Sequence, residues 1–194
     1  YFEKNNRKLG VMTVFREPME RHISSFFQVY GTRPLRLKEV EYESETIICR
    51  YTVEQLQNKF IQELADKTLV GYPESIYDIC QELQINSKEL KYSEEQMFGL
   101  YETDIVKLYV FKFDILIRNI ETLLLDVTGK KVVQNNANMS EGKFYEDIYS
   151  EFKQSLVVPH SVVFDVYDTK RDLINLLYSG KFDSILSQAL TKYS

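Results

Sequence analysis

The stretch VMTVFREPMERHISSFFQVY, residues 11–30, decides the fold that we expect for this chain. Its apolar run over residues 11–15 predicts a short buried strand. Pro18 then suits the first turn of a helix, where its missing N–H costs nothing. Apolar side chains follow at the spacing of one helical face, namely Met19, Ile23, Phe26, Phe27 and Tyr30. The stretch therefore predicts a strand that runs directly into an amphipathic helix, with Arg16 at the joint.

The start of this predicted helix combines cations with a hydroxyl group. Arg16 precedes the helix, and Arg21 lies three residues before Ser24 on the same side. Unpaired backbone N–H groups and the helix dipole both favour an anion at such a place. The pattern predicts a phosphate-binding site at the start of the helix. The alternative is that Arg16 is a surface cap and Ser24 an ordinary helix residue.

The segment FREPMERHISSFF resembles the 3′-phosphate-binding motif of sulfotransferases that use 3′-phosphoadenosine 5′-phosphosulfate (PAPS). In that motif an Arg ends a strand and a Ser follows eight residues later on the next helix. Arg16 and Ser24 keep this spacing. The sequence pattern REP…R.IS.FF most resembles that of the bacterial sulfotransferase-like family of capsular polysaccharide synthesis proteins.

This resemblance implies a transferase that moves a sulfuryl group from PAPS to a hydroxyl of a carbohydrate or polysaccharide and releases 3′-phosphoadenosine 5′-phosphate (PAP). Arg16 and Ser24 would bind the 3′-phosphate, with Arg21 as an auxiliary cation. In sulfotransferases a late basic loop closes over the cofactor, and the segment QNNANMS with Lys143 after it suits that place. A polar loop that caps a helix near residue 142 explains Lys143 equally well.

Composition limits the class of protein. The 194 residues are 44% hydrophobic and 27% charged, which is ordinary for one globular domain. A net charge of −5 disfavours non-specific nucleic-acid binding. Cys49 and Cys80 form no CxxC pair, which suits a reducing cytoplasm. No apolar run reaches the length of a membrane span, and no signal peptide is evident.

The remaining chain predicts one more strand and several helices. Thr52 and Gln55 form a capping box that opens a helix, a shorter helix covers 72–83, and 84–103 is loop-rich. Residues 105–113 predict an inner strand. Asp114 caps the helix that follows, Gly129 ends it, and its predicted inward stripe is Ile117, Ile120, Leu124 and Val127.

The second half resembles the same family and is predicted to be helical. The strand–acid–helix unit at 105–127 resembles the family's "llikyEdL" segment, with Asp114 in place of the Glu. Helices are expected at 142–155, 169–179 and 182–192, with Asp168 as N-cap of the second. This region resembles the family's C-terminal patterns at Tyr145, Tyr149, Phe152, Tyr178 and Ser179.

Two strand–helix units predict an α/β fold, a three-layer P-loop-like sandwich with a short parallel sheet and a helical C-terminal half. We expect a single sulfotransferase-like domain over 1–194. Two strands are too few for such a sheet. Further strands would therefore precede Tyr1 or lie near 47–51 and 131–134.

Catalytic residues are not assigned by the sequence. The chain has no GxxxxGK[ST], GxGxxG, HExxH or GxSxG motif, which disfavours kinases and ATPases. His22 and His160 are its two histidines, so metal catalysis is disfavoured and no metal site is predicted. His22 is either a general base or, as we expect, a solvated helix residue, and His160 is a structural residue at a turn.

The resembling family places its phosphosulfate loop and its catalytic His or Glu before the Arg…Ser motif. Fifteen residues precede Arg16 here, and they contain no such loop. We therefore expect a domain that lacks its N-terminal strand and phosphosulfate loop. The alternative function is a non-catalytic sulfotransferase-fold module for nucleotide binding or interaction. A third possibility is an unrelated α/β helical domain in which the likeness of the segment after Arg16 to the family motif is coincidental.

Overall fold

The computed structural model describes residues 8–32, 51–69, 75–133 and 145–194. The chain divides into two compact units. The sheet unit consists of Tyr1–Glu17, Pro73–Asn135 and Lys170–Phe182. The helical unit consists of Pro18–Tyr72, Asn136–Thr169 and Asp183–Ser194.

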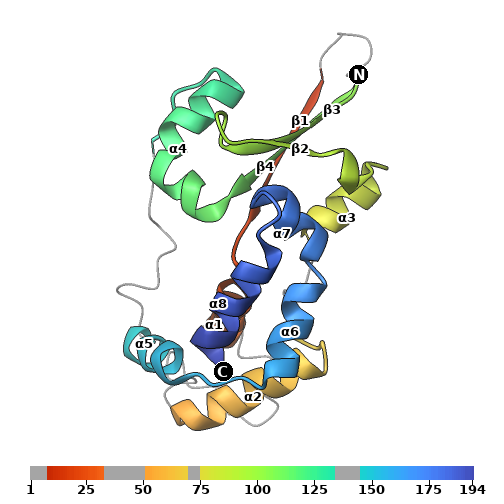
Figure 1. Ribbon diagram of the computed structural model, residues 1–194. Coiled ribbons are helices and arrows are strands. Elements are labelled where there is room, and N and C mark those ends of the chain that lie inside the picture. The colour runs from red at the N-terminus through yellow and green to blue at the C-terminus, as the bar shows by residue number, and fades with distance from the viewer. Residues whose placement is uncertain (1–7, 33–50, 70–74, 134–144) are drawn as a thin grey trace. The chain divides into compact units, whose positions relative to one another are not determined.

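The sheet unit contains a mixed sheet of four strands in the order β1-β4-β3-β2 (Figure 1). They are β1 (Leu9–Phe15), β2 (Lys91–Ser93), β3 (Phe98–Glu102) and β4 (Val106–Lys112). β1 and β4 run parallel, with Leu9 opposite Val106 and Phe15 opposite Lys112. The expected parallel pair is confirmed, but the other two pairings are antiparallel. The prediction of a loop-rich stretch at 84–103 is wrong, because β2 and β3 lie there.

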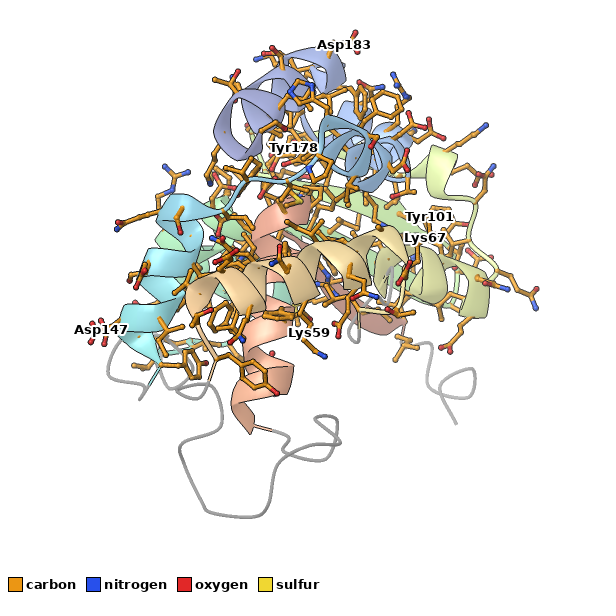
Figure 2. All side chains as sticks on the ribbon, turned by 90° about the horizontal axis from the view of Figure 1, so that it is seen from below. Lys59, Lys67, Tyr101, Asp147, Tyr178 and Asp183 are labelled. Atoms are coloured by element: carbon orange, nitrogen blue, oxygen red, sulfur yellow. The ribbon has the colours of Figure 1, made fainter. Side chains whose placement is uncertain are left out.

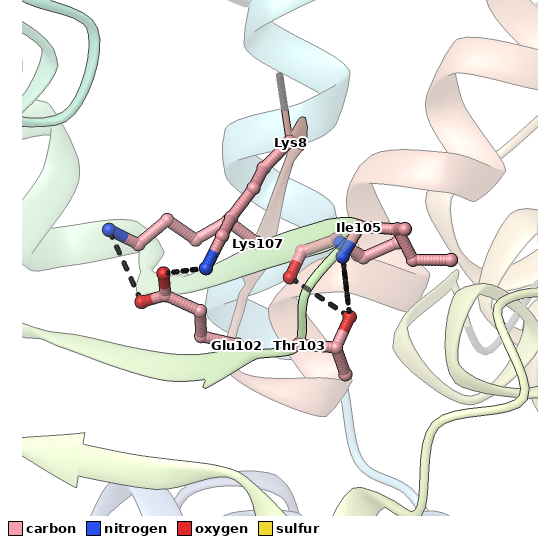
Figure 3. Close-up of polar contacts among 6 residues, drawn as sticks. Lys8, Glu102, Thr103, Ile105 and Lys107 are labelled. Carbon is pink, nitrogen blue, oxygen red and sulfur yellow. Dashed lines mark hydrogen bonds and ion pairs between the residues drawn. The ribbon is translucent and has the colours of Figure 1, made fainter. Parts of the chain in front are cut away.

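Two connections join the described strands closely. The Thr103 hydroxyl oxygen accepts hydrogen bonds from the Ile105 and Val106 backbone N–H groups, at 3.3 and 3.0 Å, and closes the β3–β4 turn (Figure 3). The Glu102 carboxylate lies between two ammonium groups, 2.6 Å from Lys8 Nζ and 3.3 Å from Lys107 Nζ (Figure 3). The Thr103 side chain thus stabilises the turn between β3 and β4.

Helices pack on the sheet within this unit. Helix α4 (Phe113–Thr128) contributes Leu123 to a buried cluster with Phe98, Tyr109 and Phe111. Gly99 lies where α7 (Arg171–Leu177) approaches the sheet, since a Cβ there would be 3.7 Å from Leu177 Cδ2. Helix α3 (Ser75–Glu82) lies within the predicted range 72–83, whose first three residues are outside the described ranges, and packs against β1. A single 3₁₀ turn, η4 (Ser87–Glu89), precedes β2.

The predicted inward stripe of α4 is wrong at Ile117, whereas Val127, another predicted member, packs against the buried cluster. Leu123 is the buried residue of this helix, whereas Ile117 is 41% exposed. A kink explains the change of face: Asn119 has φ −131°, and its side-chain amide donates to the Ile115 carbonyl at 2.9 Å. Asp114 lies in the first turn rather than at the N-cap. Gly129 ends the helix as predicted, in the left-handed conformation.

The helical unit contains α1 (Pro18–Thr32), α2 (Val53–Ala65), α5 (Glu146–Ser155), α6 (His160–Asp168) and α8 (Phe182–Tyr193). Four members of the predicted α1 stripe are buried, namely Met19, Ile23, Phe26 and Phe27. Phe152 packs against three rings, 5.9 Å from Phe26, 5.0 Å from Phe27 and 5.5 Å from Phe60 between centroids. These packed aromatic rings therefore form the core of the helical unit.

The capping box of α2 is confirmed. The Gln55 backbone N–H donates to Thr52 Oγ1 at 3.2 Å, and the Thr52 backbone N–H donates to Gln55 Oε1 at 2.9 Å. Both bonds satisfy N–H groups that a helix start leaves unpaired.

The C-terminal half is helical as predicted, but its division differs. Helix α6 was not expected, and its first residue is His160, which is exposed. Asp168 ends α6, and Lys170 is the N-cap of α7, so the predicted capping role of Asp168 is wrong. Residues 131–133 form no strand, and residues 47–50 lie outside the described ranges.

Candidate functional site

Arg16 lies directly after β1, at the edge of the sheet where two parallel strands end. It follows Phe15, the last residue of β1, which pairs in register with Lys112, the last residue of β4. The guanidinium carbon lies 4.7 Å from the centroid of the Phe113 ring. Ligands of α/β sheets bind outside the carboxyl ends of parallel strands. Arg16 is therefore at the place in the sheet unit where ligand binding is expected.

The other predicted phosphate ligands belong to the helical unit or lie outside the described residues. Arg21 and Ser24 are half-buried on α1. Arg16 belongs to the sheet unit, so its pairing with Ser24 on one phosphate stays a prediction. Lys143 and the segment QNNANMS before it lie outside the described residues.

The first turn of α1 carries an ionised carboxylate that the sequence analysis did not single out. Glu20 accepts hydrogen bonds from Lys153 Nζ at 2.7 Å, Lys192 Nζ at 2.8 Å and the Tyr193 hydroxyl at 3.2 Å. Burial raises the pKa of Glu20, but the hydrogen bonds and charges of the two lysines outweigh this effect, so the pKa falls from 4.5 to about 2. An anionic group thus already lies near the positive end of the α1 dipole.

The two histidines occupy different environments. His22 is only 5% exposed, so the expectation that it is a solvated helix residue is wrong. Its helix α1 packs against α6 in the helical unit. His160 is exposed. The catalytic base remains unassigned.

Lys112 is a candidate functional residue that the sequence pattern did not single out. It ends β4, and its side chain is 9% exposed. Its Nζ lies 4.1 Å from the centroid of the Tyr92 ring and 4.7 Å from that of Tyr178. The available signal was a lysine at the last position of a strand that is apolar apart from Lys107, just before a helix.

Metal-ligand clusters and membrane-spanning helices are both absent from the described parts of the chain. Within those ranges, no three His, Cys, Asp or Glu side chains gather to hold a metal ion. None of the helices described there combines the length and apolar character that a membrane span requires. Comparisons of the chain with protein-family models, with curated proteins and with solved structures find no match.

Proposed function

We propose that this chain is a PAPS-dependent sulfotransferase that transfers a sulfuryl group to a hydroxyl of a carbohydrate or polysaccharide. The observation that carries the proposal is the order strand, Arg16, Pro18, helix. It combines a strand end in a parallel pair with an arginine and a helix start. This is the arrangement that the sulfotransferase 3′-phosphate motif requires, and FREPMERHISSFF carries the motif's Arg and Ser.

Each proposed ligand supplies a different contact to the nucleotide. The Arg16 guanidinium suits bidentate bonding to a phosphate, and its position over the Phe113 ring restricts it before any ligand arrives. Ser24 donates a hydroxyl hydrogen bond to the same phosphate, and Arg21 adds positive charge nearby. Lys143 belongs to the loop that closes over the cofactor.

We also propose a specific fold for the chain. A three-layer P-loop-like sandwich is supported by two parallel strands, β1 and β4, each followed directly by a helix. We include in the proposal a single domain over 1–194 and a cytoplasmic location in a bacterium.

Binding of PAP is the direct test, with AMP as the ligand that lacks the 3′-phosphate. A ligand at one hundred times its dissociation constant stabilises a protein by about 2.7 kcal/mol. At roughly 2–4 °C per kcal/mol for a chain of this size, the melting temperature should rise by about 5–10 °C with PAP. Arg16→Ala and Ser24→Ala should each remove most of that rise.

Arg118→Ala is the matched control, because Arg118 is an exposed arginine of the sheet unit that bonds its own helix neighbour Asp114. It should keep the full PAP response. Equal responses to PAP and AMP, or an unchanged PAP response in Arg16→Ala, would contradict the proposal. Transfer of labelled sulfuryl from PAPS to a polysaccharide then separates the enzyme from a nucleotide-binding module.

A further inference from the structure

The side chain of Lys112 is largely buried, and its ammonium group has no hydrogen-bond acceptor among the described residues. Its side chain is 9% exposed. Within the part of the chain that the structure describes, its ion-pair partner is Glu94, whose Oε1 lies 3.9 Å away and thus beyond hydrogen-bond distance. An ammonium group has three hydrogen-bond donors, and charged acceptors give it its strongest bonds. The described contacts of Lys112 supply no acceptor at bonding distance.

Two tyrosine rings form the walls around this ammonium. Tyr92 comes from β2, and Tyr178 stands at the C-terminal end of α7 (Figure 2). Their centroids lie 4.1 and 4.7 Å from Lys112 Nζ, within the range of cation–π attraction. Ring faces attract a cation but accept no conventional hydrogen bond. The walls therefore hold the charge in place and leave its donors available.

Glu94 is a weakly held counter-ion. Its side chain is 70% exposed and comes from the turn between β2 and β3. The oxygen that faces Lys112 also accepts a hydrogen bond from the Ser179 hydroxyl at 3.1 Å. A solvated carboxylate at 3.9 Å contributes little to an ion pair. Another anion can therefore replace it at low cost.

The Tyr178 ring beside the ammonium carries a neutral hydroxyl group. Burial raises the pKa of its phenol to about 12, and the negative charges of Asp114 and Glu17 act in the same direction. The hydroxyl thus stays protonated at neutral pH. Ser179, if released from Glu94, is a second hydroxyl donor at the same place.

We infer that Lys112, between Tyr92 and Tyr178, is a binding site for a phosphate- or sulfate-class oxyanion that displaces the Glu94 carboxylate. Such an oxyanion offers the ammonium several acceptor oxygens at charge-assisted bonding distance. A compact point charge with three donors suits this ligand class. The site uses none of the residues assigned above to the 3′-phosphate, so the inference can be tested independently of the proposed function.

The test is a titration followed by nuclear magnetic resonance of protein labelled with ¹³C at the lysine ε-carbons. The Lys112 signal, displaced by the two ring currents and identified by its loss in Lys112→Arg, is followed with sodium sulfate and with sodium phosphate. Sodium chloride at matched ionic strength is the reference. A saturable shift with sulfate or phosphate supports the site. A Lys112 signal that moves no more than it does with chloride overturns it.

Two exposed carboxylates on one turn provide a matched pair of variants. Glu94→Gln removes the competing charge and should tighten oxyanion binding about fivefold, the effect of a unit charge about 4 Å away in water. Glu95→Gln makes the same change of net charge beside it and should bind as the wild type does. Equal affinities in the two variants, or weaker binding in Glu94→Gln, would overturn the inference.

The same titration in Arg16→Ala separates this site from the proposed nucleotide site. A Lys112 response that persists there, whatever the outcome of PAP binding, supports a separate oxyanion site. If the response disappears with Arg16, Lys112 only senses the nucleotide site and the inference fails.

Discussion

Glu20 joins three helices of the helical unit, and removal of its charge should destabilise that unit measurably. The carboxylate on α1 bonds Lys153 on α5, and it bonds Lys192 and Tyr193 on α8. Glu20→Gln keeps the size of the side chain and a carbonyl acceptor but leaves both lysines without their shared counter-charge. The variant therefore tests the electrostatic contribution rather than the packing.

The magnitude follows from the pKa of Glu20. Although burial raises the pKa, the two lysines lower it from 4.5 to about 2. At about 1.4 kcal/mol per pH unit, this difference sets an upper limit of roughly 3 kcal/mol on the stabilisation. Because the Lys192 side chain is 54% exposed, solvent screens part of the interaction. We expect Glu20→Gln to lower the free energy of unfolding by about 1–2 kcal/mol at pH 7.

The pH dependence has a definite sign. The folded-state pKa of Glu20 is depressed, so its stabilisation is complete well above pH 4.5 and is lost as the pH falls from 4.5 to about 2. The difference in unfolding free energy between the wild type and Glu20→Gln should therefore be constant from pH 7 to pH 6. It should fall by about half near pH 3.

Urea unfolding followed by far-ultraviolet circular dichroism at pH 7, 5 and 3 measures this difference. Glu151→Gln, an exposed carboxylate on α5, is the matched control and should change stability by less than about 0.5 kcal/mol. The reasoning is refuted if Glu20→Gln is as stable as Glu151→Gln at pH 7. It is also refuted if the loss in Glu20→Gln stays the same at pH 3.

Two further predictions concern packing and capping in the helical unit. Thr52→Ala should cost about 1 kcal/mol and lower the melting temperature by roughly 2–4 °C, because the Gln55 backbone N–H loses its hydroxyl acceptor; Thr52→Ser should keep most of the stability. Phe152→Ala should cost about 3–5 kcal/mol in urea unfolding, since the ring is fully buried. Phe164→Ala, at a 43% exposed ring, is its control, and an equal loss there would contradict the packing argument.

Part of the candidate site was predictable from local patterns. Arg16 was expected at the end of a strand just before a Pro18 helix, and the structure has this order. The partners of Glu20 and Lys112 were not predictable, because they come from segments far away in the sequence. Lys192 is separated from Glu20 by 172 residues, and Tyr178 approaches Lys112 from α7.

The sequence by itself determined the elements whose signals are local: the strand that enters α1, the buried stripe of α1, the Thr52 capping box and the Gly129 helix end. Spacing and capping act over a few residues, so they can be recognised without a partner. Only the tertiary structure decided the rest. The three residues of β2 become a strand through pairing with β3, which in turn pairs with β4. Helix α6, which begins after Pro159 without a side-chain cap, buries Val163, Val166 and Tyr167 in the helical unit. Short or uncapped segments have weak local preferences, so long-range pairing and burial determine their conformation.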